Sequence, residues 1–556
     1  MPANEPPSLS APASTDAVRN DFGSCLVANS RWLLAVLFLL CLVPRLLMGG
    51  LLSEVCDDSY YYIAVAHAVG DGDYESAFAY LNLNVYPLIL LGLRRLGIEW
   101  VAAGQLWGIL VSSLTILPLF GWVRRLFDDR VAAAACFLFA VHGSLIELSA
   151  EPIRESTFWF AVTLCLYLSR RAISEARPIF YVLAGLSLSV ALHTRTEAFL
   201  LALPMAGWWI IEAFRRPDQR GRLCLGAAAG LTAAILFVVV LNVTVLRGHD
   251  RWEFGKFHHF HIAWQWLQSR GDAVHPSIAA ARSDARASPL LHSLAASVDA
   301  STSSLLADCL KDLFRAVEPL HLWMLLAGLF GWRRTLRDPE KAVLLLAVPL
   351  LLAAIWVRLS YFGDSNSRYF LTLIFFCIPY MGLGLLWACD WTARAVGETA
   401  GRRFATPAVK AILLVFLGVG ATDALIDDHP KREMQLRMGH WLRQQLDSPE
   451  RVTVDYSAMR LGYATAGDVP DLTGSISFLQ LSERDALPDA VILSVRNLGP
   501  AEFERILSHA ESIGFERIGD DEFPRLAGEY CVLTPAAPDA GDAGTAQADA
   551  SHVTRR

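Results

Sequence analysis

Apolar residues recur along most of the chain in blocks about as long as a membrane-crossing helix. A helix needs about 20 apolar residues, at a rise of about 1.5 Å each, to cross the ~30 Å hydrocarbon core of a bilayer. The blocks lie at 32–52, 101–123, 131–148, 157–169, 179–193, 198–213, 223–246, 319–332, 342–361, 369–389 and 409–426. This pattern predicts a polytopic α-helical membrane protein with about eleven transmembrane helices.

The basic residues between the blocks predict the orientation of the chain. If the N-terminus is cytoplasmic, the segments on that side carry 20 Lys and Arg, and the short segments on the other side carry 6. Short cytoplasmic loops of membrane proteins are enriched in Lys and Arg. We therefore expect a cytoplasmic N-terminus. The stretch Tyr86–Leu96 is too short to cross and fits an amphipathic helix on the outer surface.

The segments outside the blocks predict how the chain is divided. Residues 1–30 are rich in Ser, Ala, Pro and Asn without an apolar period, as in a disordered cytoplasmic leader. Residues 31–426 are expected to form the transmembrane domain, with large outside loops at 52–100 and 247–318.

The C-terminal part has the mixed composition of a small folded domain. We expect a periplasmic α/β domain at 427–535, followed by a disordered tail at 536–556. The elements predicted within the domain are strands at 451–456, 490–495 and 530–533 and an amphipathic helix at 501–513.

Composition supports this class and excludes others. Hydrophobic residues make up 54% of the chain and charged residues 19%, against about 45–50% and 25% in globular proteins. A net charge of −7 excludes nucleic acid as the main partner, and no glycine pattern of a nucleotide site is present. Only five of the 48 basic residues are Lys, an Arg bias that favours a GC-rich bacterium and hence a bacterial inner membrane.

An acidic pair and a tyrosine run follow the first block. Asp57 and Asp58 lie at the expected membrane boundary, where partial desolvation can make a carboxylate a usable base. Tyr60 and Tyr61 suit an interfacial surface helix and are candidate substrate contacts. The alternative is a solvated acidic loop with an aromatic belt.

The second outside loop carries another acidic pair. Glu151 and Glu155 are four residues apart, so on a helix they would share a face. Arg154 is close enough in sequence to pair with either. The alternative to a functional site is an ordinary salt bridge.

Several arginines are expected on the outer side, against the usual trend. Arg154, Arg195 and Arg368 are candidate phosphate ligands, because a guanidinium offers two parallel hydrogen bonds at fixed charge. Tyr369 can place its ring at the same interface. In the alternative, Arg195 pairs with Glu197 and Arg368 pairs with Asp364, only to neutralise charge.

A histidine cluster lies in the large loop after residue 247. His258 and His259 favour substrate contact or interfacial anchoring, because no second cluster has the spacing of metal ligands. We therefore assign no metal ligands. A divalent metal that bridges Asp57 and Glu155 stays open as an addition to the acidic site.

These motifs, in this order, resemble those of GT-C integral-membrane glycosyltransferases, and most closely glycosyltransferase family 39, which includes protein O-mannosyltransferases. The resemblance covers roughly residues 30–480. It departs from the family at Thr196, where proline is usual. The motifs that carry it are the acidic pair with its tyrosines, Gln105-Leu-Trp-Gly, Arg124 to Arg130, Glu155-Ser-Thr-Phe, Thr194-Arg-Thr-Glu-Ala198, Ser367-Arg-Tyr-Phe370 and the region after Trp441.

The resemblance implies transfer of a sugar from a polyprenyl-phosphate donor to a glycan, lipid or protein acceptor on the outer face. The acidic first-loop residue would be the base, and no cofactor would be required. One base without a separate nucleophile predicts an inverting reaction.

Two other classes share the membrane setting. A transporter or flippase would need ionisable residues deep within its spans. Here most charges lie at helix ends, with Arg45 the main exception. A lipid-linked glycan polymerase or ligase would share the outside arginines.

Overall fold

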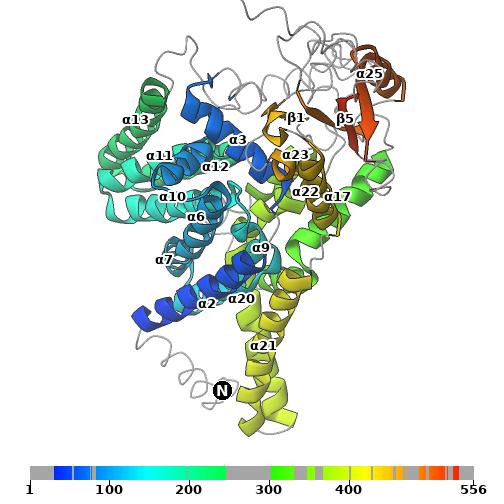
Figure 1. Cartoon of the computed structure of the whole chain (residues 1–556). Coiled ribbons are helices and arrows are strands. Elements are labelled where there is room, and N and C mark those ends of the chain that lie inside the picture. The colour runs from blue at the N-terminus through cyan, green and yellow to red at the C-terminus, as the bar shows by residue number, and fades with distance from the viewer. Residues whose placement is uncertain are drawn as a thin grey trace, which may run out of the picture.

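The computed structural model describes a helical body and a small sheet (Figure 1). The elements below belong to these described residues. They are 30–52, 55–74, 77, 83–195, 197–245, 302–330, 347–356, 367–399, 402–426, 430–446, 448–454, 459–466, 471–472, 488–495, 500–519, 523 and 530–536.

Long apolar helices form the body. In the described part of the chain, five helical segments are long and apolar enough to cross a membrane. A sixth is formed by α8 (Asp129–Val141) and α9 (Gly143–Ala150), which meet at a bend of 59°. The five are α2 (Ser30–Leu51), α6 with α7 (Trp100–Leu114 and Ile116–Leu126), α12 (Ala198–Arg215), α13 (Arg220–Val245) and α20 (Ser367–Thr399).

Helices also lie in the remaining apolar blocks. They are α10 (Glu155–Glu175), α11 (Pro178–Leu192), α18 (Pro319–Phe330), Ala347–Trp356 and α21 (Arg402–Ile426). The polytopic helical architecture is therefore confirmed, while the number of eleven crossings stays a prediction.

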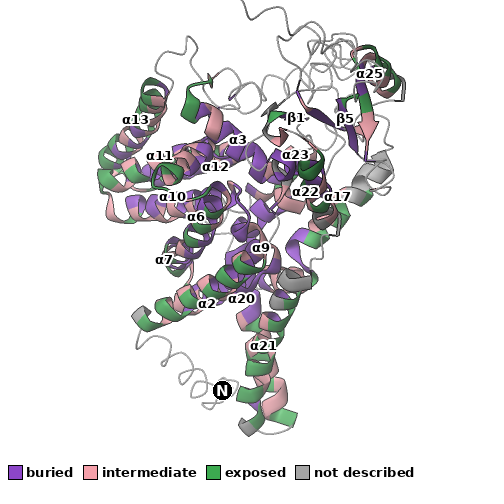
Figure 2. Cartoon of the chain, viewed as in Figure 1, coloured by how far each residue is buried: buried purple, intermediate pink, exposed green. Residues whose placement is uncertain are grey.

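Large apolar side chains are exposed along the outer helices. Leu47 on α2, Leu231 on α13 and Leu414 on α21 are 62%, 63% and 65% exposed. Figure 2 shows exposed residues along all three helices. A soluble protein rarely leaves so much contiguous apolar surface in water, whereas lipid chains cover it at no cost. These faces are those of a membrane protein.

Arg45 stabilises the break between α8 and α9. Its side chain is fully buried, and its Nη1 and Nη2 atoms donate to the carbonyls of Ala140 and Phe139, each at 3.2 Å. Its Nε atom donates to Ser112 Oγ at 2.9 Å. The last carbonyls of a helix lack partners within the helix. The one arginine deep in the first span therefore holds a broken helix end.

The helices α18 and α20 approach each other closely through glycine. A Cβ atom on Gly384 would overlap the backbone of Met324, and one on Gly328 would overlap the backbone of Tyr380. Small residues at such interfaces let helix backbones pack tightly in membranes. This packing holds the N-terminal half of α20, which begins at the candidate site.

The first outside loop contains α3 (Asp57–Asp71) and α5 (Val85–Arg95). The helix α5 coincides with the amphipathic helix expected at Tyr86–Leu96. The expectation that Tyr60 and Tyr61 lie on an interfacial surface helix is wrong, because residues 59–66 of α3 are all buried. Two apolar clusters cover this helix from different sides.

A five-stranded sheet follows the last membrane helix. Its strands are β1 (Val452–Val454), β2 (Asp471–Leu472), β3 (Ala490–Ser494), β4 (Phe515–Ile518) and β5 (Tyr530–Pro535). Their order is β2-β1-β3-β5-β4, with β1 parallel to β2 and β3, and β5 antiparallel to β3 and β4. The strands and the helix predicted here from the sequence coincide with β1, β3, β5 and α25 (Pro500–Ser512).

Further helices lie before the sheet and between its first two strands. They are α17 (Thr302–Val317), α22 (Pro430–Gln445), the 3-10 turn Pro449–Arg451 and α23 (Met459–Ala466). Arg460 on α23 donates from Nε to the carbonyl of Val55 at 3.1 Å, just before α3. Val55 and Tyr60 share an apolar cluster with Met438 and Val452. The sheet region therefore packs directly on the helix that carries Asp58.

Candidate active site

Residues from four segments distant in sequence meet at one end of the membrane helices. Asp58 lies at the start of α3, Glu155 at the start of α10, Arg195 in the turn before α12, and Arg368 at the start of α20. Ion pairs join α3 to α20 and α10 to the turn before α12. Four of the sequence motifs therefore converge.

Asp58 and Arg368 form the most solvent-exposed ion pair of this site. Asp58 Oδ2 and Arg368 Nη1 are 2.7 Å apart, and the two side chains are 29% and 22% exposed. Arg368 is therefore paired across the fold. Asp364, its partner in the charge-neutralising alternative, lies outside the described residues. The carboxylate and the guanidinium are both within reach of a molecule that enters the site.

Arg195 holds two carboxylates in a buried cluster. Its Nη1 atom is 2.7 Å from Glu155 Oε1, and its Nη2 atom is 2.6 Å from Glu197 Oε1. Burial acts to lower the pKa of Arg195, but Glu197 and Glu155 outweigh it, so this pKa lies above its ordinary value. Burial likewise acts to raise the pKa of Glu197, but Arg195 holds it below its ordinary value. Arg195 and Glu197 therefore stay ionised.

The aromatic ring of Tyr369 connects the two arginines. The guanidinium of Arg195 lies 5.4 Å from the centre of that ring, a cation–π distance. Tyr369 directly follows Arg368 on α20. The turn before α12 is therefore in contact with the start of α20.

Glu151 and Glu155 do not share a helical face, which corrects that expectation. The helix α9 ends at Ala150, and Glu151 is extended before Pro152. Proline disfavours a helical conformation in the residue before it, so the chain restarts as α10 at Glu155. Glu151 is 1% exposed and accepts a hydrogen bond from the backbone N–H of Cys56, at 2.8 Å. It thereby fixes the start of α3.

Arg154 stacks on an aromatic ring. Its guanidinium lies 5.5 Å from the centre of the Tyr62 ring. Its Nε and Nη1 atoms are buried and have no hydrogen-bond partner among the described residues. Arg154 therefore keeps N–H donors available for an anion.

The remaining sequence candidates lie in different surroundings. Tyr60 and Tyr61 are buried in the two apolar clusters that cover α3, with 6% and 7% exposed. Asp57 begins α3, but its side chain is outside the described part of the structure. His258 and His259 are also outside the described residues.

Two residues that contribute to this site were not singled out as contacts from the sequence. Tyr62 provides the ring under Arg154, although its neighbours Tyr60 and Tyr61 were the expected contacts. Asn84 donates from Nδ2 to the carbonyl of Thr194 at 3.1 Å and connects the first outside loop to the turn of Arg195. Only the folded chain brings these partners together.

One group within the described part of the chain has the arrangement of metal ligands. His142, Glu318 and His321 offer ligand atoms that all lie within 4.8 Å of one another. They belong to the breaks between α8 and α9 and between α17 and α18. The acidic residues of the first loop are not part of this group.

Comparison with known proteins agrees with this architecture. Residues 95–243 match the model of the dolichyl-phosphate-mannose-protein mannosyltransferase family. Among curated proteins, none matches the chain in sequence.

Solved structures resemble the chain over most of its length. The oligosaccharyltransferase of Archaeoglobus fulgidus, crystallised with zinc and sulfate, is 13% identical with a TM-score of 0.53, over 86% of this chain and 70% of that chain. ArnT from Cupriavidus metallidurans bound to undecaprenyl phosphate is 15% identical with a TM-score of 0.52, over 94% of this chain and 100% of that chain. Its apo structure gives 14% and 0.53 over the same shares.

These TM-scores and coverages show a common fold, and they confirm the GT-C resemblance that the motifs indicated. The chain has the fold of GT-C integral-membrane glycosyltransferases, and its residues 95–243 match the dolichyl-phosphate-mannose-protein mannosyltransferase family.

Proposed function

We propose that this protein transfers a sugar from a polyprenyl-phosphate donor to a glycan, lipid or protein acceptor on the outer face of a membrane. The family matched over residues 95–243 is named for a dolichyl-phosphate-linked sugar, and ArnT was crystallised with undecaprenyl phosphate. The arginines and carboxylates at the ends of α10 and α20 support a site for such a donor in this chain.

The Asp58–Arg368 pair is the observation that carries the proposal. A carboxylate and a guanidinium at 2.7 Å, both partly exposed, combine a base with a phosphate ligand. A donor whose polyprenyl tail stays in the bilayer would present its phosphate and its anomeric carbon at the same depth. The Asp58 carboxylate and the Arg368 guanidinium would provide the base and the phosphate ligand that the reaction needs.

In the proposed reaction, Asp58 accepts the proton of an acceptor hydroxyl while the hydroxyl oxygen attacks the anomeric carbon. The bond between that carbon and the phosphate oxygen breaks, and its electron pair leaves with polyprenyl phosphate. Arg368 and Arg154 stabilise the charge that develops on the leaving phosphate. A single displacement of this kind inverts the anomeric carbon.

Donor binding would also free the base. While Arg368 holds Asp58, the positive charge opposes proton uptake by the carboxylate. When the donor phosphate takes over the guanidinium, the carboxylate becomes available to the acceptor hydroxyl. Proton transfer would then begin only after the donor has bound.

The other acidic residues have positioning roles in this proposal. Glu155 orients Arg195, and Glu151 fixes the start of α3 next to Asp58. Asp57 is the second candidate for the base, because it precedes Asp58 on the same helix.

We also propose that the N-terminus is cytoplasmic and that the sheet region is periplasmic, in a bacterial inner membrane. The distribution of Lys and Arg between the loops supports this orientation. Cysteines introduced at 70–85 and 470–500 should react with a membrane-impermeant reagent from outside. Labelling only after the inner face is opened would overturn the orientation.

Turnover with a lipid-linked sugar tests the proposed function. The purified protein is reconstituted in lipid with polyprenyl-phosphate sugars and candidate acceptors, and free polyprenyl phosphate is measured by mass spectrometry. We expect release that depends on both substrates and is lost in the Asp57→Asn, Asp58→Asn double variant. Movement of the intact donor across the bilayer without release would favour a flippase instead.

A further inference from the structure

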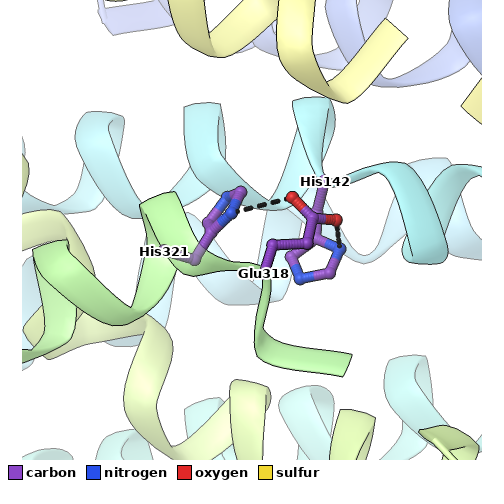
Figure 3. Close-up of side chains that lie close together, drawn as sticks. All are labelled: His142, Glu318 and His321. Carbon is purple, nitrogen blue, oxygen red and sulfur yellow. Dashed lines mark ion pairs between the residues drawn. The ribbon is translucent and has the colours of Figure 1, made fainter. Parts of the chain in front are cut away.

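A buried histidine–glutamate–histidine cluster lies apart from the acidic first-loop residues. His142 separates α8 from α9, Glu318 separates α17 from α18, and His321 lies in the first turn of α18 (Figure 3). Their side chains are 1%, 7% and 3% exposed. Two helix breaks thus meet at three groups that commonly bind metals.

The three side chains converge without forming well-aligned hydrogen bonds. His142 Nδ1 is 2.9 Å from Glu318 Oε1, and His321 Nδ1 is 3.0 Å from Glu318 Oε2. None of these atoms has a hydrogen-bond partner of acceptable alignment among the described residues, and neither does the Nε2 atom of either ring. The oxygens therefore lie near the ring nitrogens but away from the N–H directions.

The backbone around the cluster is also unusual. Glu318 has a φ of 58°, in the left-handed region that side chains disfavour. This conformation turns the chain between α17 and α18 and brings Glu318 and His321 to the same point. Such strain persists only where the surroundings hold it in place.

A tetrahedral divalent ion suits this arrangement. Zinc binds histidine nitrogen and carboxylate oxygen at about 2.0–2.2 Å, so that its ligand atoms lie about 3.4 Å apart. The ligand atoms here all lie within 4.8 Å of one another, so small side-chain rotations would close the shell. Two histidines and one glutamate form a known zinc set, with a fourth position for water.

Charge favours an ion over an empty cluster. A buried carboxylate is costly without a positive partner. Among the described residues, the ion-pair partners of Glu318 are His142 and His321. The rings of His142 and His321 lie close together, with their centres 4.5 Å apart. A divalent ion would give Glu318 a positive partner that both rings can share as ligands.

We propose that His142, Glu318 and His321 bind a divalent metal of the zinc class, which fastens the α8–α9 break to the α17–α18 break. The helix α9 leads directly to Glu151, which fixes the start of α3. The ion would thereby hold α9 in place, and through Glu151 the start of α3, without contacting a substrate. This site is independent of the sugar transfer proposed above.

Metal content of the purified full-length protein tests the site. The protein is stripped with a chelator, incubated with Zn²⁺, freed of excess metal and measured by plasma mass spectrometry. We expect about one tightly held equivalent per chain, and loss of most of it in His142→Gln and in His321→Gln. The control His67→Gln changes an exposed histidine paired with Asp71, and it should retain the metal.

A second control separates this cluster from the acidic site. Asp58→Asn should also retain the metal, and loss of metal in Asp58→Asn alone would overturn the proposal. Wild-type protein that holds no zinc after loading would overturn it too.

X-ray absorption at the zinc edge covers the case in which the histidine variants do not fold. Two imidazole ligands and an oxygen shell around zinc in the wild-type protein support the site. A sulfur shell, or an oxygen shell without imidazole, contradicts it.

Discussion

The carboxylate of Asp58, at the start of α3, lies 2.7 Å from the guanidinium of Arg368, at the start of α20. This contact joins the first outside loop to a membrane helix far along the chain. It brings the two groups of a base-assisted displacement from a phosphate together.

Arg368→Lys should weaken binding of a polyprenyl-phosphate sugar by ~1.5–3 kcal/mol, because lysine cannot form two parallel hydrogen bonds to phosphate. Binding can be measured by calorimetry in lipid nanodiscs. Arg171→Lys is the matched control, since Arg171 forms a pair with Glu175 on the same helix. Unchanged donor affinity in both Arg368→Lys and Arg368→Ala would leave Arg368 a structural role.

Arg195→Met should destabilise the fold by ~3–5 kcal/mol, because it removes the ion-pair partner of the buried Glu155 and of the partly exposed Glu197. Glu155 and Glu197 both depend on Arg195, whose side chain is 2% exposed. Denaturant unfolding in mild detergent measures the loss. Arg171→Met, which removes an i,i+4 surface pair, should unfold close to the wild-type midpoint. Equal stability of the two variants would mean that the cluster does not hold the turn before α12.

The Arg195–Glu197 pair should also give the fold an acid dependence. The folded-state pKa of Glu197 is lowered, so its contribution is present above its unfolded pKa of about 4.3 and is lost as pH falls below it. Glu197→Gln should therefore lose stability at neutral pH and show a shallower decline below about pH 4.3 than wild type. Unfolding midpoints between about pH 3 and 7 measure this. Parallel curves for the two proteins would contradict it.

Arg45→Met should destabilise the α8–α9 break, because the carbonyls of Phe139 and Ala140 lose their donor. A buried carbonyl left without a partner costs about 1–3 kcal/mol. Thermal unfolding of the purified protein measures the effect. Arg94→Met is the control, since Arg94 lies on an exposed turn of α5 over the Trp100 ring. Wild-type stability in Arg45→Met would instead reopen a functional role for this charge within the membrane.

The sequence predicts the helices better than it predicts the contacts of the site. Apolar blocks mark the helices because burial in lipid depends on local composition. The motifs also identify Asp58, Arg195 and Arg368, because charges at the outer ends of membrane helices are unusual.

Partners were harder to predict because sequence distance is a poor guide to them. Arg195 does pair with Glu197, two residues away, but Glu155 also contacts it from another helix. Arg368 pairs with Asp58, on a different helix. Similarly, His142 and Glu318 belong to different helix breaks, so no local spacing reveals their cluster.

The turnover of two single variants tests the central claim most directly. With saturating donor and acceptor, release of polyprenyl phosphate by Asp58→Asn should fall by about 10²–10⁴-fold, because loss of a general base typically costs that much. Asp57→Asn should retain most of the activity, and donor binding should persist in both. Near-wild-type turnover in Asp58→Asn, with the loss appearing only in Asp57→Asn, would contradict the assignment of Asp58 as the base beside Arg368.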